Sequence, residues 1–297
     1  MTTVRVTDLV KEFSVREGLR RRRFRAVDRV SFELVPGRTV ALVGESGSGK
    51  STIARILSKL EHPTSGEIDV RQADGRPVAP AEYRRHVQMV FQDPFASLNP
   101  FHSIEHHIAR PLRIHRRTRG ADETHERVIE MLERVNLDAS FASRRPHELS
   151  GGQRQRVAIA RALAPGAQVV LADEPVSMLD VSIRLGVLNL LGRLQREDDL
   201  AVLYITHDLA TARHFSDEIL VLYKGRVVER GPADAVILDP QHDYTRLLAM
   251  AAPDPERVGK VVSGEAAPDR AKLDNSVCFN HFTGEWEGAR TAPANAA

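Results

Sequence analysis

The segment GESGSGKS, residues 44–51, has the residue types and spacing of a phosphate-binding loop. It fits the pattern G-x-x-x-x-G-K-[ST], and the apolar run TVALVG enters it while the amphipathic run STIARILSKL leaves it. In such a loop the glycines let successive backbone N–H groups converge on a phosphate, Lys50 bridges two phosphates, and the Ser51 hydroxyl is available to Mg²⁺. The expected nucleotide-binding residues here are Gly44, Glu45, Ser46, Gly47, Ser48, Gly49, Lys50, Ser51 and Thr52.

Two carboxylates follow the apolar run VVLAD, residues 169–173. Asp173 ends the expected strand, where its carboxylate can hold Mg²⁺, and Glu174 comes next, where it is suited to polarise a water for attack on a γ-phosphate. An acidic pair in this position often only caps the following helix. Downstream of a phosphate-binding loop, we interpret Asp173 as a metal ligand and Glu174 as a general base.

The run LSGGQRQRVAIARAL, residues 149–163, raises a difficulty, because it places a Ser-Gly-Gly turn at the start of an expected helix. Backbone N–H groups and the positive end of the helix dipole make such a turn a second phosphate-binding site. One nucleotide does not need two such sites.

Two further polar residues are uninformative when taken alone. His207 follows the apolar run AVLYIT, and a single histidine there is more often a satisfied structural residue. At the carboxyl edge of a parallel sheet it could instead reach a γ-phosphate. Gln92, in VQMVFQDPFASLNP, has no assignable role by itself.

Composition limits the class of protein. The net charge is only +2 over 297 residues, which does not indicate a nucleic-acid partner. The single cysteine, Cys278, excludes an internal disulfide and fits a reducing compartment. No apolar run approaches the roughly 18 residues that span a bilayer, so we expect any membrane role to come through a partner.

The elements that must position these residues can be predicted from hydrophobic patterns. Continuous apolar strands alternating with helices indicate an α/β fold with a mainly parallel sheet covered on both faces, and the half-exposed early strands indicate an antiparallel β subdomain. The expected strands are 4–9, 30–35, 39–44, 66–70, 87–91, 169–173, 201–206 and 218–223. We expect one domain over 1–253, with a helical subdomain at about 100–165, and a loosely ordered C-terminal tail over 254–297.

The order of the motifs resembles the nucleotide-binding subunit of an ATP-binding cassette (ABC) transporter. The resemblance runs from residue 4 to 253 and includes the phosphate loop of a P-loop NTPase core, LSGGQ as the family's signature, VVLADEP, SMLD and THD. It implies ATP and Mg²⁺ as cofactors, with Ser51, Gln92 and Asp173 around the metal. It also implies that Glu174 is the catalytic base, that His207 contacts the γ-phosphate and that Gln92 contacts the attacking water. Phe13 corresponds to the aromatic residue that stacks on adenine, although Phe24 lies nearby.

The resemblance also accounts for the second phosphate-binding turn. Family members face each other head to tail, so that the loop of one cassette and the signature of the other enclose one ATP. The signature residues expected to reach the partner's nucleotide are Ser150, Gly151, Gly152 and Gln153. Asp180, in SMLD, is expected to run along the same interface.

Two phrases, FQDPFASLNP and HDYTRLLAMAAP, are similar to the oligopeptide, dipeptide and nickel importer branch. The resemblance implies a motor subunit at the cytoplasmic face of the cell membrane. Its expected partners are a second cassette, identical or paralogous, two permease subunits and a solute-binding protein. The alternatives are an exporter cassette and a soluble ABC ATPase. The transported solute is left open among peptide, nickel and other small solutes.

Three residue groups have rival interpretations. Many members of this branch carry a cysteine cluster in the tail for iron and sulfur, but Cys278 alone cannot supply about four thiolates, so we predict no cluster. The arginine run at 20–23 is expected to be a solvated loop rather than a nucleic-acid or lipid site. The histidines of FHSIEHHIARPLRIH lack the spacing of a metal site, and we expect no metal there.

Overall fold

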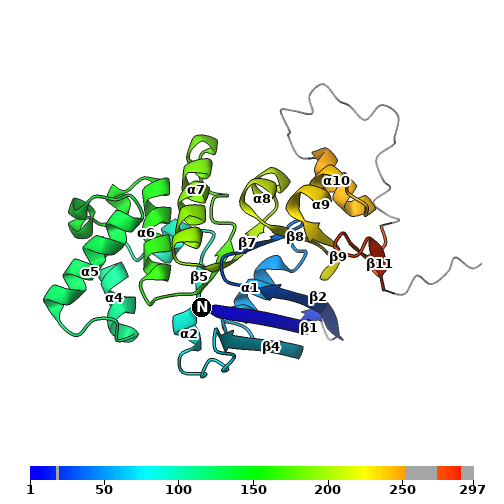
Figure 1. Cartoon of the computed structure of the whole chain (residues 1–297), viewed down its shortest axis with the longest axis horizontal. Helices are drawn as coiled ribbons and strands as arrows, with labels where there is room; N and C mark the ends of the chain where they lie inside the picture. The colour runs from blue at the N-terminus through cyan, green and yellow to red at the C-terminus, as the bar shows by residue number, and fades with distance from the viewer. Residues whose placement is uncertain (18–19, 252–272, 289–297) are drawn as a thin grey trace, which may run out of the picture.

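The chain builds two sheets, and the larger one carries the expected strand-end motifs. The computed structural model describes residues 1–17, 20–251 and 273–288. The larger sheet has the strand order β11-β10-β9-β8-β3-β7-β6-β5 (Figure 1). Its strands are β3 (Thr39–Val43), β5 (Val87–Val90), β6 (Val169–Asp173), β7 (Ala201–Thr206), β8 (Glu218–Tyr223), β9 (Arg226–Pro232), β10 (Cys278–Asn280) and β11 (Glu285–Glu287). Strands β5, β6, β7, β3 and β8 are parallel to one another, so the prediction of a mainly parallel sheet is confirmed.

The central strands are apolar throughout because both of their faces are covered. All five residues of β3 are buried. Side chains alternate across a strand, so Val40 and Leu42 join the core on one face while Ala41 and Val43 join the core on the other. Because β5, β6, β7, β3 and β8 are parallel, their carboxyl ends lie at the same edge of the sheet.

The smaller sheet is antiparallel, as expected, with the order β2-β1-β4. Its strands are β1 (Thr2–Glu17), β2 (Arg20–Leu34) and β4 (Ser65–Gln72). The arginine run, expected to be a loop, instead continues the ladder, since Arg22 is paired with Val15 and Arg23 with Ser14. The prediction of a loop was wrong because backbone pairing with β1 continues through the basic residues to Glu17 and Arg20.

The helices cover the sheet and form a separate group at one end of the molecule (Figure 1). They are α1 (Lys50–Leu57), α2 (Tyr83–His86), α3 (Pro94–Ser97), α4 (Ile104–Ile114), α5 (Ala121–Arg134), α6 (Gly151–Leu163), α7 (Val181–Glu197), α8 (Leu209–Phe215), α9 (Ala233–Leu238) and α10 (Asp243–Ala251), with 3-10 turns at Ala139–Ser143 and Pro146–Glu148. Helices α4, α5 and α6 make up the end group, where a helical subdomain was expected. Among the described residues, no helix is long and apolar enough to cross a bilayer.

A short C-terminal hairpin adds two strands to the edge of the large sheet. Strand β10 pairs with β9 in parallel, with Phe279 opposite Glu229, and β11 pairs with β10. The hairpin lies within the stretch for which the sequence predicts a loosely ordered tail. The other residues of that stretch, 254–272 and 289–297, lie outside the described residues.

Candidate functional site

The loop at residues 44–51 connects β3 to α1 and is enclosed by backbone from two other strands. A Cβ added to Gly49, which has φ +111°, would lie 2.3 Å from the carbonyl oxygen of Ala26. A Cβ added to Gly44 would lie 2.2 Å from the carbonyl oxygen of Leu222. Larger residues therefore do not fit at these two positions, and β2 and β8 hold the loop close to the sheet.

Lys50 is buried in this loop and its ammonium group turns back onto the loop itself. Its Nζ donates to the carbonyl oxygens of Gly44, at 2.5 Å, and Glu45, at 2.8 Å. Burial lowers the pKa of Lys50, while the nearby carboxylates of Glu174 and Asp173 act to raise it. The buried Ser48 hydroxyl has no hydrogen-bond partner within the described chain. A buried cation and an unsatisfied hydroxyl in a glycine-rich loop are suited to bind phosphate oxygens.

Ser51 and Asp173 lie together at the carboxyl end of β6. The Ser51 hydroxyl donates to Asp173 Oδ1 over 3.0 Å. Burial raises the pKa of the Asp173 carboxyl, and the Ser51 hydrogen bond only partly opposes this. Hydroxyl and carboxylate oxygens are the ligands that Mg²⁺ takes in phosphate sites, so these residues fit the metal that the loop implies.

Glu174 lies between the two other residues expected to be catalytic. Gln92 Nε2 donates to Glu174 Oε2 over 3.1 Å, and His207 Nδ1 lies 3.3 Å from Glu174 Oε1. Glu174 has φ +44°, a left-handed conformation that is unfavourable for a non-glycine residue. Its backbone N–H donates to the Ile205 carbonyl, which holds this conformation. The structure thus brings Gln92, Glu174 and His207 together from three different strand ends.

A cavity of about 740 Å³ joins these groups. Phe13 and Phe24 are direct cross-strand partners of β1 and β2, and both line it. The sequence suggested Phe13 and left Phe24 as the alternative, and the structure places both aromatic rings at this cavity. Its lining residues are Phe13, Phe24, Ala26, Glu45, Ser46, Gly47, Gly49, Lys50, Ser51, Thr52, Gln92, Glu174, His207, Leu248 and Ala251.

The sequence analysis missed the part of this lining that comes from α10. Leu248 and Ala251 belong to HDYTRLLAMAAP, which suggested only a branch resemblance. Nothing in the local pattern places α10 near residue 45, because this contact is made between segments about 200 residues apart. Ala26 was missed for the same reason.

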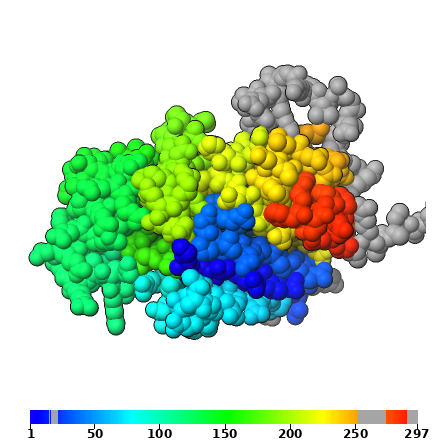
Figure 2. All heavy atoms as spheres, in the orientation of Figure 1, coloured from blue at the N-terminus to red at the C-terminus, as the bar shows by residue number. Residues whose placement is uncertain are grey.

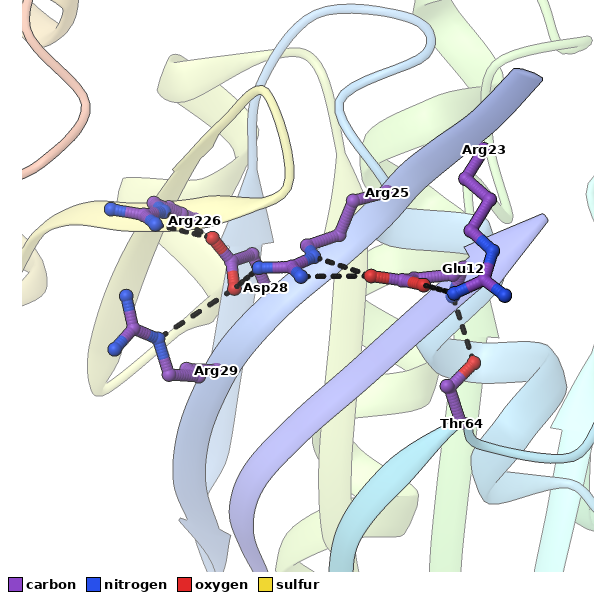
Figure 3. A network of polar contacts seen from close by, with 7 residues as sticks. All are labelled: Glu12, Arg23, Arg25, Asp28, Arg29, Thr64 and Arg226. Carbon is purple, nitrogen blue, oxygen red and sulfur yellow. Dashed lines mark hydrogen bonds and ion pairs between the residues drawn. The ribbon is translucent and has the colours of Figure 1, made fainter. Parts of the chain in front are cut away.

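The Glu12–Arg25 pair, which is next in register to Phe13 and Phe24, belongs to an ion-pair network. Figure 3 shows this network. Arg25 bonds Glu12 with two nitrogens and Asp28 with a third. Asp28 also accepts from Arg226 on β9, and Arg29 is 3.6 Å away. Burial alone would raise the pKa of Asp28, but the hydrogen bond and charge of Arg226, together with Arg25, lower it below the ordinary value. The network ties the antiparallel sheet to the large sheet beside the cavity.

The signature turn is not part of this cavity. Ser150 caps α6, its Oγ accepting from Gln153 N while Gln153 Oε1 accepts from Ser150 N. Ser150, Gly152 and Gln153 instead line a separate depression of about 370 Å³. Asp180 is exposed at the start of α7, and it lines neither of these two cavities. The structure therefore does not bring the two phosphate-binding turns of one chain together.

A larger groove of about 1,170 Å³ runs from Gln92 along α4. His102 and His106 stack there at 4.0 Å between ring centroids, and Arg110 and His107 also line it. Within residues 1–17, 20–251 and 273–288, no three histidine, cysteine or acidic side chains are grouped so as to hold a metal ion. The groove combines basic side chains with exposed apolar ones such as Phe91.

Comparison with known proteins identifies relatives of this chain. A family model described as ABC transporter matches residues 27–177. The chain is 46% identical over 289 residues to the glutathione import ATP-binding protein GsiA of Escherichia coli K12, covering 95% of this chain and 45% of that protein. It therefore spans less than half the length of that relative. It is 45% identical to the dipeptide transport ATP-binding protein DppF of Haemophilus influenzae, covering 82% of this chain and 76% of that protein.

Solved structures give the same result for the fold. A dimeric post-hydrolysis state of the ATP-binding cassette MJ0796, bound to ADP and Pi, superposes with a TM-score of 0.65 and 33% identity, covering 77% of this chain and 98% of that one. The cbiO1 protein of Clostridium perfringens, part of the transporter complex cbiONQ, gives a TM-score of 0.66 at 26% identity, covering 80% of this chain and 90% of that one.

Proposed function

The chain belongs to the ABC transporter family, and from this we propose that it is an ATP-hydrolysing motor subunit of an importer. The observation that carries the proposal is the position of Glu174, held between Gln92 and His207 beside the Ser51–Asp173 pair. Glu174, Gln92, His207 and Ser51 line one cavity together with the aromatic rings of Phe13 and Phe24. Asp173 lines the neighbouring groove, which shares Ser51 and Gln92 with this cavity. That arrangement suits a nucleoside triphosphate, with its base near Phe13 or Phe24 and its phosphates in the loop.

Each side chain has a distinct part in the proposed reaction. Glu174 accepts hydrogen bonds from Gln92, so its carboxylate is oriented to take a proton from an attacking water. Lys50 exchanges its loop carbonyls for phosphate oxygens, and His207 lies where it can contact the terminal phosphate. Ser51, Asp173 and Gln92 would hold Mg²⁺, which would neutralise part of the charge of the phosphates.

We propose that the site is completed by a second cassette. The signature turn of this chain lines a different depression from the nucleotide cavity, which supports a role across a dimer interface. Ser150 and Gly152 would then reach the γ-phosphate bound by the partner, with Gly151, Gln153 and Asp180 along the same interface. Because the contacts to both chains exist only in the closed pair, ATP favours closure and hydrolysis permits reopening.

The two relatives are named as ATP-binding proteins for glutathione import and for dipeptide transport, and this favours a small peptide as the transported solute. The proposed partners are two permease subunits, with a solute-binding protein in the assembled transporter. The groove along α4, next to Gln92, supports a permease contact there, since movement at Gln92 would be passed directly to a segment seated in it. The proposed location is the cytoplasmic face of the membrane. Affinity purification of the tagged chain from membranes, followed by identification of the bound proteins, tests this assembly.

The substitution Glu174→Gln tests the proposed activity. The glutamine side chain has the same size as that of glutamate and can occupy the same position, but its amide cannot accept a proton. We expect nucleotide binding to persist while ATP turnover falls by at least about 100-fold, in the range lost with a general base. Glu126→Gln, on the exposed side of α5, is the matched control and should keep full turnover. Normal steady-state ATPase activity in Glu174→Gln would refute the assigned base.

A further inference from the structure

Helix α10 makes a direct contact with the phosphate-binding loop. The hydroxyl oxygen of Tyr244 accepts a hydrogen bond from the backbone N–H of Glu45 over 2.9 Å. The carbonyl of the same peptide unit, Gly44 O, accepts from Lys50 at 2.5 Å. The Gly44–Glu45 peptide is thus held at both of its polar edges, by a lysine within the loop and by a tyrosine from the C-terminal region.

Tyr244 is itself held tightly. Its side chain is fully buried, and its ring lies against that of Tyr223 with 4.3 Å between centroids. Its backbone N–H donates to His242 Nδ1 over 3.1 Å. A buried ring packed in this way has few alternative rotamers, so the position of its hydroxyl is set by the start of α10.

The start of α10 is in turn fixed by β9 and by the C-terminal hairpin. The fully buried Glu229 accepts from the backbone N–H groups of Gln241 and His242. His281 of the hairpin lies 2.7 Å from Glu229 through Nε2, and His242 Nε2 lies 2.6 Å from the Asp274 carbonyl. Figure 2 shows the hairpin, in red, against the yellow surface of the chain that includes β9 and α9. The contacts therefore form an unbroken chain from the hairpin to the phosphate-binding loop.

We propose that Tyr244 is a positioning residue for nucleotide binding, and that the C-terminal hairpin sets its position. When Lys50 leaves Gly44 for a phosphate oxygen, the Tyr244 hydroxyl keeps the Gly44–Glu45 peptide in place, so the loop enters the bound state without reorganising. The proposal rests on the proposed nucleotide site. It makes nucleotide binding depend also on residues 273–288, which lie outside the segment 27–177 that the family model matches.

Tyr244→Phe removes only the hydroxyl and keeps the packed ring. One net hydrogen bond corresponds to about a 3- to 10-fold change in an equilibrium constant. We therefore expect the dissociation constant for Mg–ADP, measured by calorimetry on the full chain, to rise by about that factor. KM for ATP should rise similarly while kcat changes less than about twofold. Tyr223→Phe is the matched control, since its ring is the packing partner of Tyr244 and, among the described residues, its hydroxyl makes no hydrogen bond to the loop. It should leave both constants unchanged.

His281→Ala tests the contribution of the hairpin, with the exposed Phe282→Ala as its control. We expect weaker Mg–ADP binding for His281→Ala only. Unchanged affinity in Tyr244→Phe, or an equal loss in Tyr223→Phe, would overturn the positioning role, and unchanged affinity in His281→Ala would overturn the role of the hairpin. Failure of the unmodified chain to bind Mg–ADP at all would instead reject the proposed function.

Discussion

Cys278 shows how burial decides the chemistry of a single side chain. It lies on β10, and its thiol donates a weak hydrogen bond to the Phe279 carbonyl oxygen over 3.7 Å. Burial, with the neighbouring charge of Glu287 as a smaller cause, raises the pKa of Cys278 to about 12. A thiol of this kind is almost fully protonated at neutral pH, and thiolates rather than thiols react with electrophiles and bind metals.

We therefore predict slow labelling of Cys278. Its rate of reaction with iodoacetamide at pH 8 should be at least about tenfold below that of a free cysteine peptide, because so little thiolate is present. In denaturant the rate should rise to that of the peptide, and this serves as the internal control. Fast labelling of the folded chain would contradict the raised pKa of this half-buried thiol.

Asp28 links a strand of the antiparallel sheet, β2, to a strand of the large sheet, β9. It connects β2 to β9 through Arg226, and through Arg25 it reaches Glu12 on β1 (Figure 3). Arg25 is 49% exposed, so water screens its share of the network, whereas Asp28 is 8% exposed. The Glu12–Arg25 pair is adjacent in register to the Phe13–Phe24 pair at the cavity. The network therefore stabilises the strand segment that presents these aromatic rings.

We predict that Asp28→Asn lowers the free energy of unfolding by about 1–2 kcal/mol at pH 7, as expected for losing charge-assisted hydrogen bonds that are partly screened. The pKa of Asp28 is lower in the folded chain than its ordinary value. Its contribution is therefore present above about pH 4 and is lost as the pH falls through the lower, folded-state pKa. Denaturant titrations at several pH values should show the two proteins converging in acid. The exposed Asp74→Asn is the control and should show no difference at pH 7.

The sequence predicts some elements at their observed bounds and does not predict others. Strands β6 and β7 were predicted at their observed bounds because burial on both faces makes them apolar up to their last residues, Asp173 and Thr206. Strands β10 and β11 were not predicted, since CFN and EWE are too short to show a pattern. Strand β10 depends on pairing with β9, and β11 depends on pairing with β10. The loop and the strand-end acids could be recognised locally. The Tyr244 contact and the Phe13–Phe24 pairing could not, because they depend on register and on packing between distant segments.

In the whole molecule, the two turns that are expected to bind phosphate line different cavities. A single chain of this shape cannot enclose one nucleotide with both. The second turn, in LSGGQ, is therefore expected to act on a nucleotide bound by another chain. Each of two chains would then supply half of every site.

This arrangement predicts that Ser150→Arg acts only in an assembled pair. The substitution places a large cation where the partner's nucleotide is expected, but it adds nothing to the cavity that Lys50 and Glu174 line in the same chain. We expect the affinity of the monomer for Mg–ATP to change less than about twofold, while ATPase activity of the assembled complex is abolished. Ser143→Arg introduces the same charge at an exposed position in the helical region and should keep that activity. Because Ser150 also caps α6, thermal unfolding of both variants separates a loss of stability from a loss of assembly.

The shared site is tested best by the molar mass of Glu174→Gln in solution, measured by light scattering with and without Mg–ATP. Without nucleotide we predict a monomer, and with Mg–ATP a dimer that cannot hydrolyse its nucleotide and so does not reopen. Adding Ser150→Arg to the same chain should return it to a monomer while Mg–ATP still binds. A molar mass that does not change when Mg–ATP is added, or a dimer that persists in the Glu174→Gln, Ser150→Arg double variant, would contradict the shared site.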